Sequence, residues 1–280
     1  MTDSTDNTIV PETPVTIPSP PQNSLISKLR RLPPEIHRLP SCGLLYKNDE
    51  LSPTVKDAEL EFFPMTALDE LDLKSPDMLL DGRAITRVLG RCVPGIQKPL
   101  DLYARDLDFI MIALRKVAYG DIFEATFKHD CEGAKEHNYN VSLTALMNSA
   151  KVIDPTTLAS KYTVTVGSGD ISYKVTLRPL RAKHAIDLIQ SFDDEKTEED
   201  RRSNLFAMFI FSINDVDGIT DTKNILEWLE QIPVQWIDPI SKRIEEISNW
   251  GTPHEKTEKC KDCGQDIKLM VNVNPLTFFI

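Results

Sequence analysis

A pair of cysteines late in the sequence constrains the fold more than any other feature. Cys260 and Cys263 stand in the segment EKCKDCGQDIKLMV, residues 258–271. A Cys-x-x-Cys pair followed by glycine is typical of a metal-binding knuckle, because the glycine permits the tight turn that points backbone amides at the thiolates. A closed tetrahedral site needs four ligands, so a second part of the chain must come to this pair.

The cysteine count favours a metal over a disulfide. The chain has five cysteines in 280 residues, an odd and sparse set, with no positively charged and apolar start of the kind that directs secretion. We therefore expect a reducing cytoplasm, and we expect no membrane span because no run of eighteen apolar residues occurs. The strand-to-helix setting of a redox-active Cys-x-x-Cys is also missing.

The charge argues against nucleic acid as a partner. The net charge is −11 and the isoelectric point is near 5.0, which repels a phosphate backbone. Apolar residues make up 41% of the chain, enough for a globular core.

The sequence predicts three regions. Residues 1–37 form an extended or disordered N-terminal arm, because residues 1–24 are rich in Thr, Ser and Pro and lack hydrophobic periodicity. Residues 38–150 and 151–280 form two similar halves, each with a β-hairpin or strand, helices and a metal knuckle. The expected fold class is α+β and mostly helical, with the halves joined by a split, zinc-ribbon-like site.

Local signals place the elements of these halves. We expect strands at 55–63, 122–128 and 139–143, a hairpin around the turn GSGD at 167–170, and a possible strand at GLLY, residues 43–46. Thr66 is a candidate N-cap, Pro76 a first helical residue and Gly120 a C-cap of a helix at about 105–118. Further helices are expected at about 181–191, 198–213, 222–231 and 239–249, the last two separated by prolines.

The two halves share an order of motifs. A strand leads into a proline, helices follow, and an aromatic-glycine pair precedes a cysteine and another strand. The matching pairs are Pro64 and Pro179, Ala67 and Ala182, Tyr119-Gly120 and Trp250-Gly251, and Cys131 and Cys263. This order indicates a duplication, although common strand–proline–helix turns could produce it by coincidence.

The repeat points to the missing half of the metal site in KHDCEGAKEH, residues 128–137. The predicted ligands are Cys131, His137, Cys260 and Cys263, with His129 as the alternative to His137. Thiolate and imidazole both suit Zn²⁺, and iron is not excluded. Such a site would be a structural clasp between the halves. The plainer reading is unligated thiols and solvated histidines.

No catalytic or cofactor-binding constellation is assembled in the sequence. Glu136 beside His137 could act as a general base in a metal-dependent hydrolase, but that reading needs an open coordination position. A zinc-ribbon adaptor that binds nucleic acid is a further alternative, and it needs a basic face.

The order of motifs RLPSCGLLY, PMTALDE, SPDMLLDGRAI, DLDFIMIALRKVAYGD, Cys131 and the late Cys-x-x-Cys resembles the baseplate hub and hub-assembly chaperone family of T-even-type contractile phages, over roughly residues 38–280. Members of that family often carry a first Cys-x-x-Cys after the YG segment, where this chain has Lys128 in place of the first cysteine. The resemblance implies a role without catalysis in tail assembly. It also implies phage baseplate and hub proteins as partners, docking of the N-terminal arm on neighbours, and a location in the virion baseplate after assembly in the host cytoplasm.

Overall fold

The structure is a computed structural model of the 280-residue chain. It describes residues 33–44, 46–131, 135–155, 162–193, 206–273 and 278–279. The chain divides into two units, Met1–Leu32 and Pro33–Ile280, and every element described below belongs to the second. The expectation of an extended arm over residues 1–37 lies almost wholly outside the described residues, except that Glu35–His37 belong to the first strand.

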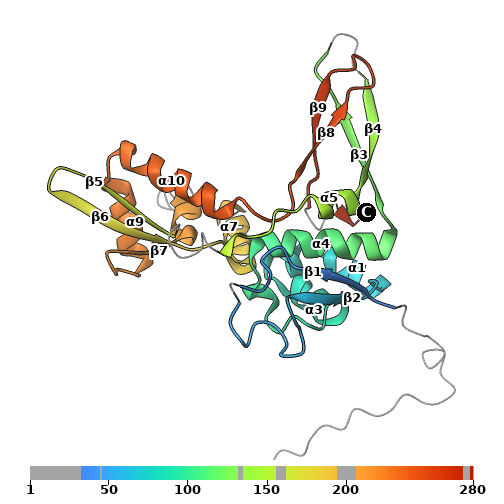
Figure 1. Ribbon diagram of the computed structural model, residues 1–280, viewed down its shortest axis with the longest axis horizontal. Helices are drawn as coiled ribbons and strands as arrows, with labels where there is room; N and C mark the ends of the chain where they lie inside the picture. Colours follow the sequence, from blue (N-terminus) through green and yellow to red (C-terminus); the bar gives the residue numbers. More distant parts are fainter. Residues whose placement is uncertain are drawn as a thin grey trace, which may run out of the picture. The chain divides into compact units, whose positions relative to one another are not determined.

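The first strands and helices follow their local sequence signals (Figure 1). Thr66 caps its helix in a capping box with Asp69, and Pro76 begins the next helix, as expected. Gly82 adopts φ +74° immediately before the helix Arg83–Cys92, and Gly120 is the C-cap of the helix Ala104–Tyr119. The elements are β1 (Glu35–Arg38) paired antiparallel with β2 (Glu59–Phe62), α1 (Ala67–Leu73), α2 (Pro76–Leu80), α3 (Arg83–Cys92), the 3-10 turn η2 (Pro99–Asp101) and α4 (Ala104–Tyr119).

Two antiparallel ribbons lie side by side in Figure 1. The first ribbon pairs β3 (Ile122–Lys128) with β4 (Glu136–Ser142), and the second pairs β8 (Glu255–Lys259) with β9 (Asp266–Met270). The short helix α5 (Leu143–Asn148) follows β4 and packs on α4.

The remaining elements build a second core. The hairpin of β5 (Thr163–Ser168) and β6 (Ile171–Leu177) forms as expected and gains a third strand, β7 (Ile213–Val216). The helices around this sheet are the helical residues 206–212, α9 (Thr222–Gln231) and α10 (Val234–Ser248), whereas α7 (Ala182–Asp193) packs against α2, η2 and α4. One hydrophobic cluster joins the first helices to both ribbons, and another joins this sheet to α9 and α10.

The helix expected over 198–213 is confirmed in its described part, residues 206–212, and Ile213, which pairs with Leu177 of β6, begins the strand β7. Two other expectations about local structure are wrong. Pro239 does not separate two helices but lies inside α10, which begins after Pro233 and there lacks one backbone donor. In GLLY, Gly43 and Leu44 lie in a turn, and Tyr46 belongs to no strand.

The α+β class with small antiparallel sheets is confirmed. The two halves expected at 38–150 and 151–280 and their duplication stay predictions, and residues Pro33–Ile280 form one compact unit. Within the described residues, no helix has both the length and the apolar composition that crossing a membrane requires.

Candidate metal centre and the Arg181 network

The first ribbon turns one face of each strand inward. Along β3 the side chains of Phe123, Ala125 and Phe127 are half-buried, whereas their neighbours are exposed. The same alternation continues past the end of the strand to His129 and Cys131, which are both half-buried. A period of two therefore places a histidine and a cysteine on the inner face at the end of the ribbon.

The second ribbon ends in a tight turn between β8 and β9. The Cys260 amide donates to the Gln265 carbonyl at 2.8 Å, and the Gly264 amide donates to the Cys260 carbonyl at 2.9 Å. Gly264 has φ +73°, a conformation that favours glycine and closes the turn. Both cysteines of the pair are held by this turn, with Cys260 buried and Cys263 exposed.

The two ribbon ends bring four ligand-bearing side chains together. One ligand atom from each of His129, Cys131, Cys260 and Cys263 lies within 4.8 Å of the other three, and Cys263 Sγ is 3.4 Å from His129 Nδ1. A tetrahedral site with Zn–S bonds near 2.3 Å has S–S edges of about 3.8 Å. The donor set and its spacing therefore fit a four-coordinate thiolate-rich metal site.

The local electrostatics differ between the cysteines. Hydrogen bonds from the Cys263 and Asp262 backbone amides, with a contribution from His129, lower the pKa of Cys260 to about 6. Burial and the neighbouring thiols of Cys263 and Cys260 raise the pKa of Cys131 to about 12. A cluster of thiols that cannot all ionise by themselves is a setting in which a bound cation would be stabilising.

His137 lies outside this cluster. It pairs opposite Phe127 in the first ribbon, and its Nε2 is 2.8 Å from Oδ1 of Asp262. The other Asp262 oxygen accepts the Lys135 amide at 3.0 Å, and the hydrogen bond from His137 lowers the pKa of the carboxyl group. Of the four ligands predicted from the sequence, the structure gathers Cys131, Cys260 and Cys263, and it adds His129, the alternative, in place of His137.

The alternation of β3 is the signal that could have favoured His129. In FKHDC the residues Phe127, His129 and Cys131 share one face, whereas His137 belongs to the partner strand β4. Glu136, the general base of the hydrolase alternative, is exposed on β4 opposite Lys128.

Contacts that need no metal also join the ribbons. The Lys261 amide donates to the Tyr139 hydroxyl at 3.2 Å, and Lys261 Nζ donates to the Asn138 carbonyl at 2.6 Å. The same ammonium lies 5.0 Å from the centroid of the Tyr139 ring. The turn between Cys260 and Cys263 is thus already oriented toward the first ribbon.

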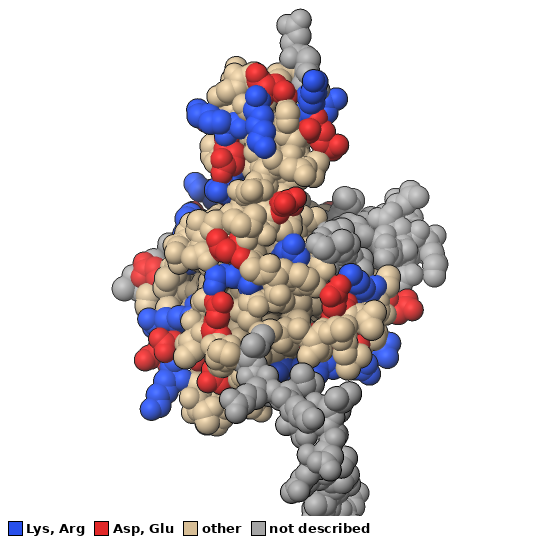
Figure 2. Space-filling model, turned by 90° about the vertical axis from the view of Figure 1, so that its right-hand side faces the viewer, with Lys and Arg blue, Asp and Glu red and all other residues tan. Residues whose placement is uncertain are grey.

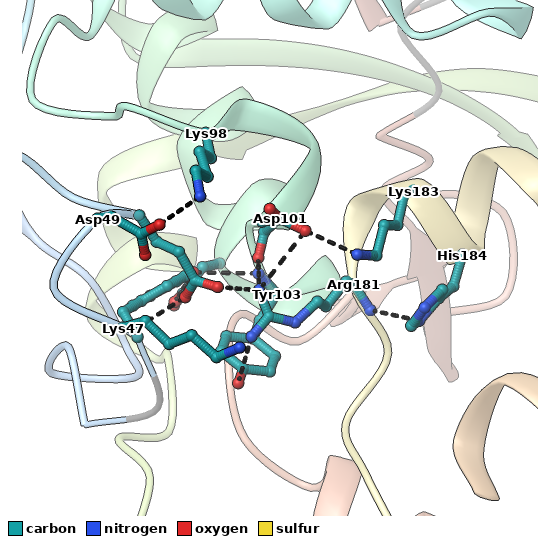
Figure 3. Close-up of polar contacts among 11 residues, drawn as sticks. Lys47, Asp49, Lys98, Asp101, Tyr103, Arg181, Lys183 and His184 are labelled. Carbon is teal, nitrogen blue, oxygen red and sulfur yellow. Dashed lines mark hydrogen bonds and ion pairs between the residues drawn. The ribbon is translucent and has the colours of Figure 1, made fainter. Parts of the chain in front are cut away.

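A second polar network centres on Arg181, which precedes α7 (Figure 3). Its guanidinium donates to Glu50 Oε1 at 2.7 Å, to the Asp101 carbonyl at 2.6 Å and to the Tyr103 hydroxyl at 3.2 Å. It also lies over the Tyr103 ring, 4.8 Å from the centroid. Lys183 adds a hydrogen bond to Asp101 at 2.8 Å. These contacts join the region of η2 and α4 to the start of α7.

Two backbone hydrogen bonds join the same segments as the Arg181 network. The Ala182 amide donates to the Leu102 carbonyl at 2.7 Å, and the Ala104 amide donates to the Leu180 carbonyl at 2.9 Å. The Glu50 side chain is only 5% exposed, so its charge is paired with Arg181 where little water reaches it. This pair leaves no signal in the sequence, because 131 residues separate its members and neither belongs to a motif.

Charges of both signs are mixed on the face of the molecule shown in Figure 2, where Lys and Arg alternate with Asp and Glu over the ribbons and the body below them. On the second ribbon, Lys259 forms an ion pair with Asp266 and Lys268 forms one with Glu255. That face presents no surface of a single sign to a partner.

The fold and the cluster together define an α+β protein of small sheets whose two ribbons meet at a cysteine- and histidine-rich centre. A family profile described as "T4 bacteriophage base plate protein" matches residues 50–280. The chain therefore belongs to this family of phage baseplate proteins, and the resemblance to baseplate proteins of T-even-type phages is confirmed at the level of the family. No curated protein and no solved structure gives a significant match.

Membership of this family indicates the general role of the chain. It indicates a structural component of a bacteriophage baseplate, a protein that associates with other baseplate proteins, and a location in the tail baseplate of the virion. A structural family of this kind suggests a role other than catalysis.

Proposed function

We propose that the protein is a structural subunit or assembly factor of the baseplate hub of a contractile tail, and that a Zn²⁺ ion bound by His129, Cys131, Cys260 and Cys263 clasps its two ribbons. The family match over residues 50–280 is the observation that carries the baseplate role. The subunit acts without catalysis and assembles in the host cytoplasm before it is incorporated into the particle.

The closed donor set supports a structural metal over a catalytic one. Each of the four clustered side chains offers one ligand atom, so the set is complete without water or substrate. The ligands come from segments about 130 residues apart, as the 134-residue separation of His129 and Cys263 illustrates. Because such distant segments meet only in the folded chain, the metal binds the folded state and its binding free energy stabilises that state.

The N-terminal arm is the second part of the proposal. Residues 1–24 have the composition of a segment that orders only on a partner, and segments of this kind dock on neighbouring subunits in large assemblies. We assign this arm to contacts with other baseplate and hub proteins.

A direct test follows the protein through tail assembly. Phage that carries a chain without residues 1–24 should produce soluble protein of unchanged circular dichroism that is missing from purified tails, as measured by mass spectrometry of the particles. Normal incorporation of that chain would remove the arm from the proposal. Absence of the full-length protein from both tails and assembly intermediates would remove the baseplate-hub role altogether.

A separate measurement tests the metal. Protein purified anaerobically and without chelator should contain one equivalent of zinc or iron by elemental analysis, and the Cys131→Ser and Cys260→Ser variants should contain much less. Full-length protein without bound metal would refute the clasp and leave the baseplate role untouched.

A further inference from the structure

A hollow lined by aromatic side chains lies between the β5–β6 hairpin and the helices α9 and α10. It has a volume of about 410 Å³, and its lining includes Tyr173, Trp228 and Trp236. The Tyr173 ring centroid is 5.5 Å from that of Trp228 and 6.1 Å from that of Trp236, so the three rings form one contiguous surface.

The rim of this hollow exposes apolar side chains. Ile171, at the start of β6, is 58% exposed and also lines the hollow, and Val234, the first residue of α10, is 79% exposed. Pro233, the residue before Val234, and Trp236, two residues after it, both line the hollow. An exposed apolar rim around aromatic rings is typical of a binding surface rather than of a solvated face.

Two of the side chains that line this hollow carry a buried hydrogen-bond donor for which the described residues provide no acceptor. The Nε1 atoms of Trp228 and Trp236 are buried, and neither has a hydrogen-bond partner within the part of the chain that the structure describes. Buried donors without a partner are rare in folded proteins, because they lose their bonds to water without replacement. Small side-chain rotations, which are common when partners bind, would present either N–H group to an acceptor in the hollow.

The chain itself contains a segment of the matching chemistry. Residues 11–21 read PETPVTIPSPP, with prolines at 11, 14, 18, 20 and 21. Proline-rich segments favour the polyproline II conformation, whose carbonyls make no internal hydrogen bonds and whose rings fit aromatic grooves. A segment of this kind therefore supplies acceptors for the indole N–H groups and flat apolar rings for the three aromatic side chains.

We propose that the aromatic hollow formed by Tyr173, Trp228 and Trp236 is the docking site for residues 11–21 of a second copy of this chain. The proposal deepens the docking role assigned to the arm above, because it names one receptor surface for it. Each copy carries both the arm and the hollow, so the contact is heterologous and joins copies head to tail.

The experiment uses full-length protein with Pro14, Pro18, Pro20 and Pro21 all replaced by serine, so that its own arm does not compete. A peptide of residues 9–23 is titrated into it, and binding is followed by tryptophan emission and by calorimetry. The wild-type peptide should bind saturably and shift the emission to shorter wavelength. A matched peptide with serine at every proline should bind at least about tenfold more weakly.

Two substitutions test whether the hollow is the surface that binds the peptide. Trp236→Leu and Ile171→Ser should each weaken peptide binding by about tenfold or more. Ile171 is largely exposed, so its substitution leaves the core unchanged and keeps the test valid if the tryptophan variant fails to fold. Val152→Ser, another exposed apolar residue, at 62% exposure and outside the hollow, is the control and should leave binding unchanged.

Several outcomes would overturn the inference. They are failure of the peptide to bind, equal binding by the Ile171→Ser variant, and an unmodified full-length protein that stays monomeric by light scattering at every concentration although the peptide binds. Self-association that persists in the proline-to-serine variant would show that a different surface joins the copies. If removal of residues 1–24 blocks incorporation into tails but the peptide does not bind, the proposed function stands and this docking site does not.

Discussion

The Nε2 atom of His137 lies 2.8 Å from Oδ1 of Asp262, a residue of the turn between Cys260 and Cys263. This contact gives His137 the role of a support for the knuckle, whereas His129 has its Nδ1 atom 3.4 Å from Cys263 Sγ. The two histidines of the first ribbon should therefore respond differently to substitution.

We expect His129→Ala to lower the bound metal well below one equivalent, because it removes one of four ligands. His137→Gln should keep one equivalent, with an affinity reduced by about tenfold to a hundredfold at most, since its effect passes through the orientation of Asp262. Elemental analysis after dialysis against a graded chelator series measures both values. The reverse order of effects would return His137 to the ligand set.

Removal of the metal should lower the free energy of unfolding, by an amount that increases with the affinity of the metal. A ligand present at a hundred times its dissociation constant adds about 2.7 kcal/mol to the free energy of unfolding, and chelation removes this contribution. Thermal unfolding with and without chelator should show a lower melting temperature for the chelated protein. Cys260→Ser should already have the lower value and not respond to chelator.

Cys42→Ser is the matched control for this measurement, because Cys42 lies in a turn outside the cluster. Its melting temperature should fall on chelation as much as that of the unmodified chain. A chelator response that Cys260→Ser retains would show that the stabilising metal binds elsewhere.

Where local chemistry decides the conformation, the sequence predicts it well. Three helix ends lie where a single residue predicts them. Thr66 caps the start of α1, Pro76 is the first residue of α2, and Gly120 caps the end of α4. The helix expected over 222–231 coincides with α9, which Asp221 caps.

Where distant segments decide the conformation, the prediction fails. Ile213–Val216 reads INDV and is not among the strands expected from the sequence, but it pairs with β6 as the strand β7. The choice between His129 and His137 likewise depends on the register of β3 with β4 and on Asp262 in the other ribbon, 125 residues from His137. Neither relationship can be read from spacing alone.

Replacement of Arg181 should lower the stability of the protein, because it would leave the buried charge of Glu50 without a partner. Without its guanidinium the Glu50 carboxylate, 5% exposed, would be buried and unpaired, which costs about 3 kcal/mol or more. We therefore expect Arg181→Met to lower the free energy of unfolding by about that amount in urea titrations.

The double variant Arg181→Met with Glu50→Gln should recover a large part of the loss, since it removes the unpaired charge. Lys183→Met is the control, because its side chain is 48% exposed and its ion pair with Asp101 should contribute less than about 1 kcal/mol. Equal losses for Arg181→Met and Lys183→Met would refute the special role of the buried pair.

Asp106 should make stability depend on pH. It is fully buried and accepts hydrogen bonds from the Ser41 amide at 3.1 Å and the Tyr46 hydroxyl at 2.8 Å, and burial raises its pKa from 3.8 to about 6. A carboxyl group whose pKa is raised on folding stabilises the folded state below the unfolded pKa, and this contribution is lost as the pH rises through about 6. The loss is on the order of 3 kcal/mol.

Asp106→Asn should remove this contribution, because the amide does not ionise. Its oxygen can still accept from the Ser41 amide, whereas its NH2 group replaces the oxygen that accepts from Tyr46 and can donate to the Tyr46 hydroxyl oxygen. Urea titrations from pH 4 to pH 7 should show a flatter dependence of stability on pH for Asp106→Asn than for the unmodified chain. Asp77→Asn, at an exposed position in α2, is the control and should follow the unmodified chain. An unchanged slope in Asp106→Asn would assign the pH dependence to other groups.

Gly251 should tolerate no side chain, because of a close approach by α4. It has φ +86°, and a Cβ atom added there would lie 2.9 Å from the Cβ atom of Arg105. Its backbone also exchanges two hydrogen bonds with Lys151, at 2.8 and 3.0 Å, so it has little freedom to shift.

Gly169, in the turn of the β5–β6 hairpin, offers the matched comparison. It has φ +62°, and a Cβ atom there would meet nothing within 4 Å. Gly169→Ala should therefore cost only the backbone strain of about 1 kcal/mol, whereas Gly251→Ala should add overpacking and cost about 2–4 kcal/mol in total. Denaturation midpoints in urea measure the difference, and equal costs at the two positions would show that Arg105 moves aside freely.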